Sequence, residues 1–220
     1  PRYYRTGHID IGWGALGTAY DAEVENWPKV IDWDLSLDRA WECLETWVKE
    51  ATPVAEKYGV RLGLHPVDPP MPEIGGVPSL LINFENYKRM IDIVDSPYNS
   101  ILFCQGSFSQ FAGADQDNGE SIYDMIEYFV KRERVLYVHF RNVSGTVPKF
   151  HETFVNTGNV DMYRAMRIYA ENGFDGFFMD DHVPMTIGDS GWGYRSKAYA
   201  NGYIQSLIET VTDTSLYGLH

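Results

Sequence analysis

Apolar residues recur at spacings of three or four in five segments of the chain, a pattern that predicts helices with one buried face. These helices are expected from residue 37, over 83–96, 120–134 and 161–173, and over roughly 195–212. Shorter apolar runs predict buried strands at 60–66, 100–104, 134–140 and 174–180. Strand and helix alternate in this order, which predicts a parallel sheet with right-handed crossovers and places the chain in the α/β class.

Single residues indicate where several elements end. Pro53 lies inside the first helical segment and is expected to kink or break it, because proline lacks the N–H of a helix interior. Asn83 is expected to cap the second helix, and Gly173 to end the fourth. Residues 1–36 contain many Gly, Trp and Asp without a sustained period, so an irregular loop region is expected there. No linker or repeat divides the chain, and we expect one domain over residues 1–220.

Composition narrows the class of function. The 18 basic and 31 acidic residues give a net charge of −13, which argues against nucleic acid or an anionic membrane as a partner. No run of residues approaches the roughly 20 apolar positions of a membrane span. Two cysteines, Cys43 and Cys104, do not make a disulfide scaffold, although a bridge between them stays open. A cytoplasmic protein is the expectation.

Ionisable side chains stand at the ends of the four predicted strands. His65, Cys104 and His139 end the first three strands, and Asp181 with His182 follows the last. Consecutive positions are separated by 35 to 42 residues, about one strand–helix unit. Parallel α/β folds bring the carboxyl ends of their strands to one rim, so these groups should meet. Two imidazoles, a thiolate and a carboxylate could together bind one divalent cation.

Each of these residues also has an ordinary explanation. A histidine after a strand is commonly a hydrogen-bonded core residue, and a single cysteine is commonly packed in the core. A single aspartate can cap a helix. The metal-site hypothesis is preferred because all four positions coincide with strand ends.

Polar residues beside the strand ends are candidates for substrate binding. Arg141 and Asn142 follow the third strand and suit a carboxylate or a hydroxyl group, whereas a surface salt bridge is the alternative for Arg141. Ser107 lies just beyond the second strand, and His151 lies in the stretch after the third. Nearby acidic residues could serve the same site or only solvate their loops: Asp68, Glu73 and Glu152.

Six stretches, in order, resemble the D-mannonate dehydratase family, which belongs with the xylose-isomerase-like TIM barrels. They cover most of residues 25–184 and read ENWPKVIDW, GVRLGLHPVDPP, SPYNSILFCQGS, YVHFRNVSG, KFHETFVNTGNVDMYRAM and GFDGFFMDDHVP. The resemblance implies a TIM (β/α)8-type barrel and a hydro-lyase of sugar acid catabolism. Such an enzyme removes water from D-mannonate, an intermediate of glucuronate metabolism, and yields 2-keto-3-deoxy-D-gluconate.

The resemblance also implies a divalent metal ion held by four residues already singled out: His65, Cys104, His139 and Asp181. Mn²⁺ is the first expectation, with Co²⁺, Mg²⁺, Fe²⁺ and Zn²⁺ as alternatives. The metal polarises the substrate oxygens while a base removes the proton next to the carboxylate and an acid protonates the departing hydroxyl. His182 and Tyr194 are the catalytic candidates for these proton transfers, beside the ligand Asp181.

One residue and the length of the chain depart from the family. Where the family usually has Arg-Pro-Asp-His-Gly, this chain has Met179 through Val183. Loss of the arginine is expected to weaken binding of an anionic or polyhydroxy substrate, which leaves a related sugar acid or sugar open. An isomerase or epimerase of the same superfamily is the enzymatic alternative, and a non-catalytic half-barrel subunit is the other.

The four predicted strands are half of an eight-stranded barrel. The matching part is expected to be the C-terminal half. Four strands alone would leave two unpaired sheet edges, which further strands are expected to cover. Either an N-terminal half absent from this chain or a second chain, as in a homo-oligomer, is expected to supply the other strands. The expected ligand is a small sugar acid, and nucleic acid and membranes are not expected as partners.

Overall fold

A four-stranded parallel sheet forms the centre of the protein, as the alternating pattern predicts. The computed structural model describes residues 5–21, 28–112 and 121–212. The sheet contains β3 (Leu62–Leu64), β6 (Asn99–Cys104), β7 (Val135–His139) and β10 (Phe178–Met179). They lie in the order β10-β7-β6-β3, and every neighbouring pair is parallel. All four predicted strands are therefore confirmed, with the chain crossing over between each one and the next.

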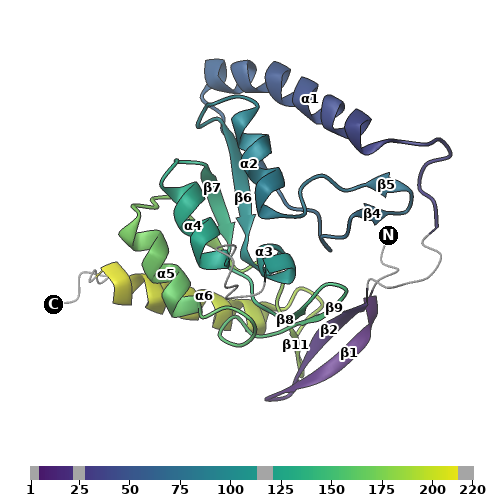
Figure 1. Ribbon diagram of the computed structural model, residues 1–220. Coiled ribbons are helices and arrows are strands. Elements are labelled where there is room, and N and C mark those ends of the chain that lie inside the picture. The colour runs from purple at the N-terminus through teal and green to yellow at the C-terminus, as the bar shows by residue number, and fades with distance from the viewer. Residues whose placement is uncertain (1–4, 22–27, 113–120, 213–220) are drawn as a thin grey trace.

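The helices connect these strands and flank the sheet (Figure 1). Their bounds are Leu37–Tyr58 for α1, Phe84–Asp92 for α2, Gln105–Ala112 for α3, Ile122–Val130 for α4, Met162–Glu171 for α5 and Tyr194–Thr212 for α6. The Asn83 side chain accepts a hydrogen bond from the backbone N–H of Asn86, so the predicted cap of α2 is confirmed. None of the helices in the described ranges combines the length and the apolar character needed to cross a membrane.

Of the kink or break expected at Pro53, the break is contradicted by the structure, and the kink stays a prediction. Helix α1 continues through Pro53 to Tyr58 and ends at Gly59, which adopts the left-handed conformation of a C-cap. Pro53 and Lys49 are both exposed. The Lys49 carbonyl, which would receive the hydrogen bond that proline cannot donate, therefore lies on the solvent side, where water can replace it.

A second sheet corrects the expectation of an irregular loop over residues 1–36. Strands β1 (Arg5–Gly12) and β2 (Ala15–Asp21) form an antiparallel hairpin, while residues 1–4 and 22–27 lie outside the described ranges. Strand β2 pairs with β9 (Lys149–Glu152), β9 pairs with β8 (Val143–Thr146), and β11 (Met185–Thr186) also pairs with β2. Four glycines interrupt the hairpin, so no period of two marked it in the sequence.

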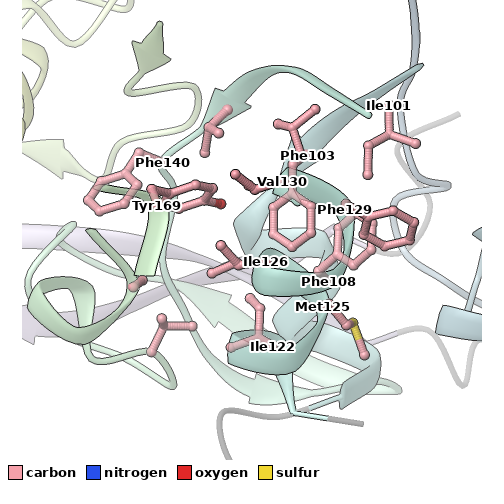
Figure 2. Close-up of a cluster of buried hydrophobic side chains, with 14 of the residues drawn as sticks. Ile101, Phe103, Phe108, Ile122, Met125, Ile126, Phe129, Val130, Phe140 and Tyr169 are labelled. Carbon is pink, nitrogen blue, oxygen red and sulfur yellow. The ribbon is translucent and has the colours of Figure 1, made fainter. Parts of the chain in front are cut away.

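The hydrophobic core fills the space between the parallel sheet and its helices. Figure 2 shows the aromatic side chains at its centre, where Phe103 of β6 stacks on Phe108 with ring centroids 4.1 Å apart. Phe129 of α4 and Tyr169 of α5 pack edge-on or tilted against the same group. This aromatic core fixes β6 and β7 against the helices, and thereby fixes the residues at the ends of these strands.

The opposite face of the parallel sheet is open. Tyr137 of β7 stacks on Phe177 with ring centroids 4.7 Å apart, yet Phe177 is 59% exposed and Met179 is 38% exposed. Within the described residues no further strand pairs with β3 or β10. The small β4–β5 hairpin (Glu73–Ile74 and Val77–Pro78) lies apart from both sheets.

Candidate functional site

Four side chains converge at the carboxyl ends of the parallel strands. Cys104 ends β6 and is paired in register with His139, which ends β7, while His65 directly follows β3. One ligand atom from each of these three residues lies within 4.8 Å of the other two. Asp181 follows β10 and places Oδ2 3.4 Å from Nδ1 of His139 and 3.8 Å from the Cys104 sulfur. We call these four residues the donor cluster.

The backbone at Asp181 is held in an uncommon conformation. Its φ is +56°, the left-handed region that aspartate tolerates better than most non-glycine residues. Lys197 of α6 donates a hydrogen bond to the Asp181 carbonyl oxygen at 3.0 Å and pairs with the Asp180 carboxylate at 3.1 Å. Helix α6 therefore fixes the turn that aims Asp181 at the strand ends. Asp180, in contrast, is occupied by Lys197.

Charge in the donor cluster is distributed between acids and imidazoles. Burial disfavours the Cys104 thiolate, but His139, His65 and the charge of Arg141 outweigh it and lower the pKa of Cys104 to about 6. Burial likewise disfavours the His139 imidazolium, but the adjacent Asp181 and Cys104 raise the pKa of His139 to about 9. The pKa of Asp181 is lowered despite burial, chiefly by His139. A cation entering the cluster would thus meet two anionic donors and would displace imidazole protons.

The donors fit a divalent transition metal. Both ring nitrogens of His139 are buried and lack a partner of hydrogen-bond geometry among the described residues, which is costly for a polar group unless a ligand satisfies it. His65 directs Nδ1 at the Pro66 carbonyl oxygen, 2.6 Å away, which leaves Nε2 available. A backbone partner on the second nitrogen is the usual way in which proteins orient a metal-binding histidine.

Arg141 is buried, which rules out the surface salt bridge considered above. It is 1% exposed, and its guanidinium makes two contacts with the Glu152 carboxylate, at 3.1 Å from Nε to Oε2 and 2.5 Å from Nη2 to Oε1. Nη1 donates to Asp68 at 2.8 Å and lies 4.0 Å from Asp181. The guanidinium of Arg141 is therefore paired with protein carboxylates beside the donor cluster. This pairing does not support direct binding of a substrate by Arg141.

Asn142 is also occupied by the protein. Its amide nitrogen donates to the carbonyl oxygens of Val155 and Val160, and its oxygen accepts from the backbone N–H groups of Val143 and Val160. All four hydrogen-bonding positions of the amide are used within the loop, at 1% exposure. This geometry contradicts the predicted substrate contact and assigns Asn142 to holding the loop after β7.

The remaining predicted residues fall in different places. Ser107 is fully buried on α3 and donates to the Cys104 sulfur at 3.2 Å, so it supports a ligand candidate. His151 on β9 alternates with the buried Glu152 and therefore points to the other face of that strand. Tyr194 begins α6 at 66% exposure, and in the described ranges no hydrogen bond or ion pair joins it to the donor cluster. Its catalytic role stays a prediction.

His182 lies beside the donor cluster, as predicted. Its Nδ1 is 2.9 Å from Oε1 of Glu152, and its Nε2 is 3.9 Å from Oδ1 of Asp181. The hydrogen bond to Glu152 is the main cause that raises the pKa of His182.

The sequence offered Glu152 only as a nearby acidic residue without a stated role, whereas in the structure its carboxylate contacts Tyr20, Arg141 and His182. Burial opposes its ionisation, but the charge of Arg141 and the contact with His182 lower the pKa of Glu152 to about 2. One feature of the sequence could have identified it. In the short strand KFHE, Glu152 is two residues after Phe150 and therefore lies on the same buried face of the strand.

Comparisons with known proteins identify the family of this chain. A family model described as D-mannonate dehydratase (UxuA) matches residues 24–216. The mannonate dehydratase of Thermotoga petrophila is 36% identical over 180 residues, which cover 79% of this chain and 48% of that protein. A solved mannonate dehydratase from Streptococcus suis serotype 2 is 27% identical with a TM-score of 0.85, covering 98% of this chain and 64% of the other.

A xylose isomerase domain protein from Alicyclobacillus acidocaldarius shares the fold at 15% identity, with a TM-score of 0.60 over 85% of this chain and 63% of that one. The expected partial TIM-type barrel is confirmed. The chain spans about half the length of the curated relatives it matches. Because the family model matches most of the chain and the relatives are mannonate dehydratases, the chain belongs to the D-mannonate dehydratase family.

Proposed function

We propose that the chain carries the metal centre of a hydro-lyase that removes water from a sugar acid, with D-mannonate as the first substrate to test. The observation that carries this proposal is the convergence of the donor cluster at the barrel rim of a chain in this family. The corresponding product is 2-keto-3-deoxy-D-gluconate.

The donor cluster would hold one divalent ion, with Mn²⁺ as the first choice and Co²⁺, Mg²⁺, Fe²⁺ or Zn²⁺ as alternatives. A mixed set of imidazole, carboxylate and thiolate donors suits transition metals better than hard cations, which favours the others over Mg²⁺. Such an ion would polarise substrate oxygens and stabilise the negative charge that develops beside the carboxylate.

His182 is the base in this proposal. Its Nε2 faces the donor cluster, where it would accept the carbon-bound proton next to the substrate carboxylate. The neighbouring hydroxyl leaves as water after it receives a proton from an acid, for which Tyr194 stays the candidate. The electron pair of the broken C–H bond becomes the new carbon–carbon double bond, and the resulting enol tautomerises to the keto acid.

Recognition of the substrate carboxylate is not assigned to Arg141, because Glu152 and Asp68 already occupy its guanidinium. Met179 stands on β10 in register with His139, at the position where the resemblance calls for arginine. An uncharged residue beside the donor cluster favours a substrate whose oxygens bind chiefly to the metal. The other strands of the barrel, from further sequence or from a second chain, would provide the remaining contacts.

Product analysis tests the proposal. The purified chain, supplied with Mn²⁺, is incubated with D-mannonate, and the products are resolved by mass spectrometry beside Asp181→Ala. A product lighter by one water, formed by the unaltered chain and absent with the variant, is expected. A product of unchanged mass would indicate epimerisation or isomerisation instead, and a metal-loaded chain without any product would leave the binding-subunit alternative.

A further inference from the structure

The Glu152 carboxylate joins β9 to three other segments of the chain. It is 2% exposed on β9, and its carboxylate receives hydrogen bonds from Arg141, from the Tyr20 hydroxyl at 3.0 Å and from Nδ1 of His182 at 2.9 Å. Asp68 shares Arg141 from the loop after β3. The carboxylate is therefore fixed by partners on several sides before any substrate arrives.

The backbone of β9 is also held closely. Gly17 of β2 approaches so near that a Cβ atom there would lie 2.1 Å from the Glu152 carbonyl oxygen. Only glycine permits this contact between the N-terminal hairpin and β9. Tyr20, on the same hairpin, stacks on Phe150 with ring centroids 4.6 Å apart. The hairpin thus braces Glu152 through both its backbone and its side chain.

His182, in contrast, has few constraints of its own. Its side chain is 41% exposed, and it directly follows the left-handed turn at Asp181. Among the described residues the Glu152 carboxylate is the one hydrogen-bond partner of the ring. Without that partner the imidazole could rotate or exchange the proton between its two nitrogens.

We propose that Glu152 is the positioning residue of His182, which it holds in the Nδ1–H tautomer so that the lone pair of Nε2 faces the donor cluster. The catalytic role of this contact rests on the proposed function. The tautomer of His182, however, can be measured whether or not the protein turns over a substrate. A carboxylate paired with arginine only accepts hydrogen bonds, so Nδ1 must carry the proton and Nε2 must carry the lone pair. The same tautomer is the one that a base at Nε2 requires.

Nitrogen NMR tests the tautomer in the unaltered protein. The chain is labelled with ¹⁵N-histidine, His182→Ala assigns the His182 signals, and two-bond ¹H–¹⁵N correlations are recorded at a pH where the ring is neutral. We expect a single Nδ1–H tautomer. An Nε2–H tautomer in the unaltered chain would overturn the inference without recourse to any variant.

Two variants then separate positioning from general support. In Glu152→Gln, one amide oxygen replaces two carboxylate oxygens, and three donors compete for it. We therefore expect His182 to become a mixture of tautomers or to change to Nε2–H. Tyr20→Phe removes a different partner of Glu152 and should leave the His182 tautomer unchanged. An unchanged tautomer in folded Glu152→Gln, or an equal change in both variants, would contradict the assignment.

Kinetics with D-mannonate add a readout that a purely structural role would not produce. Glu152→Gln should lower kcat by about 10- to 100-fold, in the range seen for partners that orient a catalytic or metal-bound group, with little change in KM. In a His182→Ala background the same substitution should lower kcat no further. Equal losses in both backgrounds would contradict positioning through His182. If the chain shows no turnover even when the strands that complete the barrel are supplied, the proposed function fails, while the tautomer measurement still decides the role of Glu152.

Discussion

Phe103 and Cys104 are neighbours on β6, yet they belong to two regions with opposite properties. Phe103 points into the aromatic core, where it stacks on Phe108 and packs against Phe129. Cys104 points to the other face, where it meets the imidazoles and the carboxylate of the donor cluster. Alternation along one strand thus separates the two regions by a single residue.

The two regions differ in the contacts that their side chains make, although the Tyr169 hydroxyl in the aromatic core also lacks a hydrogen-bond partner among the described residues. Rings in the aromatic core lie in stacked and edge-on contacts with other rings, as expected of a packed interior. The donor cluster instead contains two buried ring nitrogens of His139 without hydrogen-bond partners in the described residues. The comparison indicates that the core contributes stability, whereas the donor cluster gathers ionisable side chains that could bind a ligand.

The largest expected effect comes from the aromatic core. Phe103→Ala should lower the free energy of unfolding by about 3–5 kcal/mol, because the ring is fully buried and leaves a cavity. Urea unfolding measures this loss, and a metal titration of the folded variant should show an affinity close to that of the unaltered chain. A large loss of metal affinity in a variant that stays folded would show that the two regions are not separate.

The next effect is the pH dependence of metal binding. His139 has a pKa of about 9 and Cys104 a pKa of about 6, so near neutral pH a metal must displace a proton from His139 but not from Cys104. Metal affinity should therefore rise by about tenfold per pH unit between pH 7 and 9 and then level off. Isothermal titration calorimetry in buffers of different ionisation enthalpy measures the released protons. Affinity independent of pH over this range would contradict the assigned charge distribution.

Gly106→Ala should destabilise the protein by displacing the buried Arg141 side chain beside the donor cluster. A Cβ atom at Gly106 would lie 2.7 Å from Cδ and 3.0 Å from Nε of Arg141, which is held by its carboxylate partners and cannot easily move. Overpacking of this kind should lower the free energy of unfolding by about 1–3 kcal/mol. Gly202→Ala on α6 is the matched control, since open space surrounds its Cβ position and alanine favours a helix by up to about 1 kcal/mol. Equal thermal unfolding of the two variants would contradict the tight approach at Gly106.

The smallest effect is expected from Tyr20→Phe. The variant loses the hydroxyl that donates to Glu152 but keeps the ring that stacks on Phe150. Since Arg141 and His182 still satisfy the carboxylate, the loss should be about 1 kcal/mol, the usual net value of one hydrogen bond. Chemical denaturation measures this loss. A loss as large as that of Phe103→Ala would contradict the account, because it would mean that the Tyr20 hydroxyl stabilises the fold far more than one hydrogen bond can.

Much of the parallel sheet and the donor cluster could be predicted from the sequence. The strands were continuous apolar runs, and parallel strands bring their carboxyl ends to one rim, so His65, Cys104, His139 and Asp181 could be grouped without coordinates. The N-terminal hairpin could not, because Gly7, Gly12, Gly14 and Gly17 interrupt its alternation.

The hydrogen-bond partners of buried polar groups could not be predicted from the sequence either. Arg141 and Asn142 looked suited to a substrate, and only their neighbours in space reveal that the protein itself occupies them. Glu152 became important through contacts from Tyr20, Arg141 and His182, which lie up to 132 positions away in the chain. Local periodicity contains no information on such long-range pairs.

The central claim is that the donor cluster is a metal site, and the metal content of the purified chain tests it most directly. After Mn²⁺ is supplied to folded protein and excess ion is removed, elemental analysis should find one divalent ion per chain, and none in His65→Ala or Asp181→Ala. A folded, unaltered chain that retains no metal, or variants that retain as much metal as the unaltered chain, would contradict the claim.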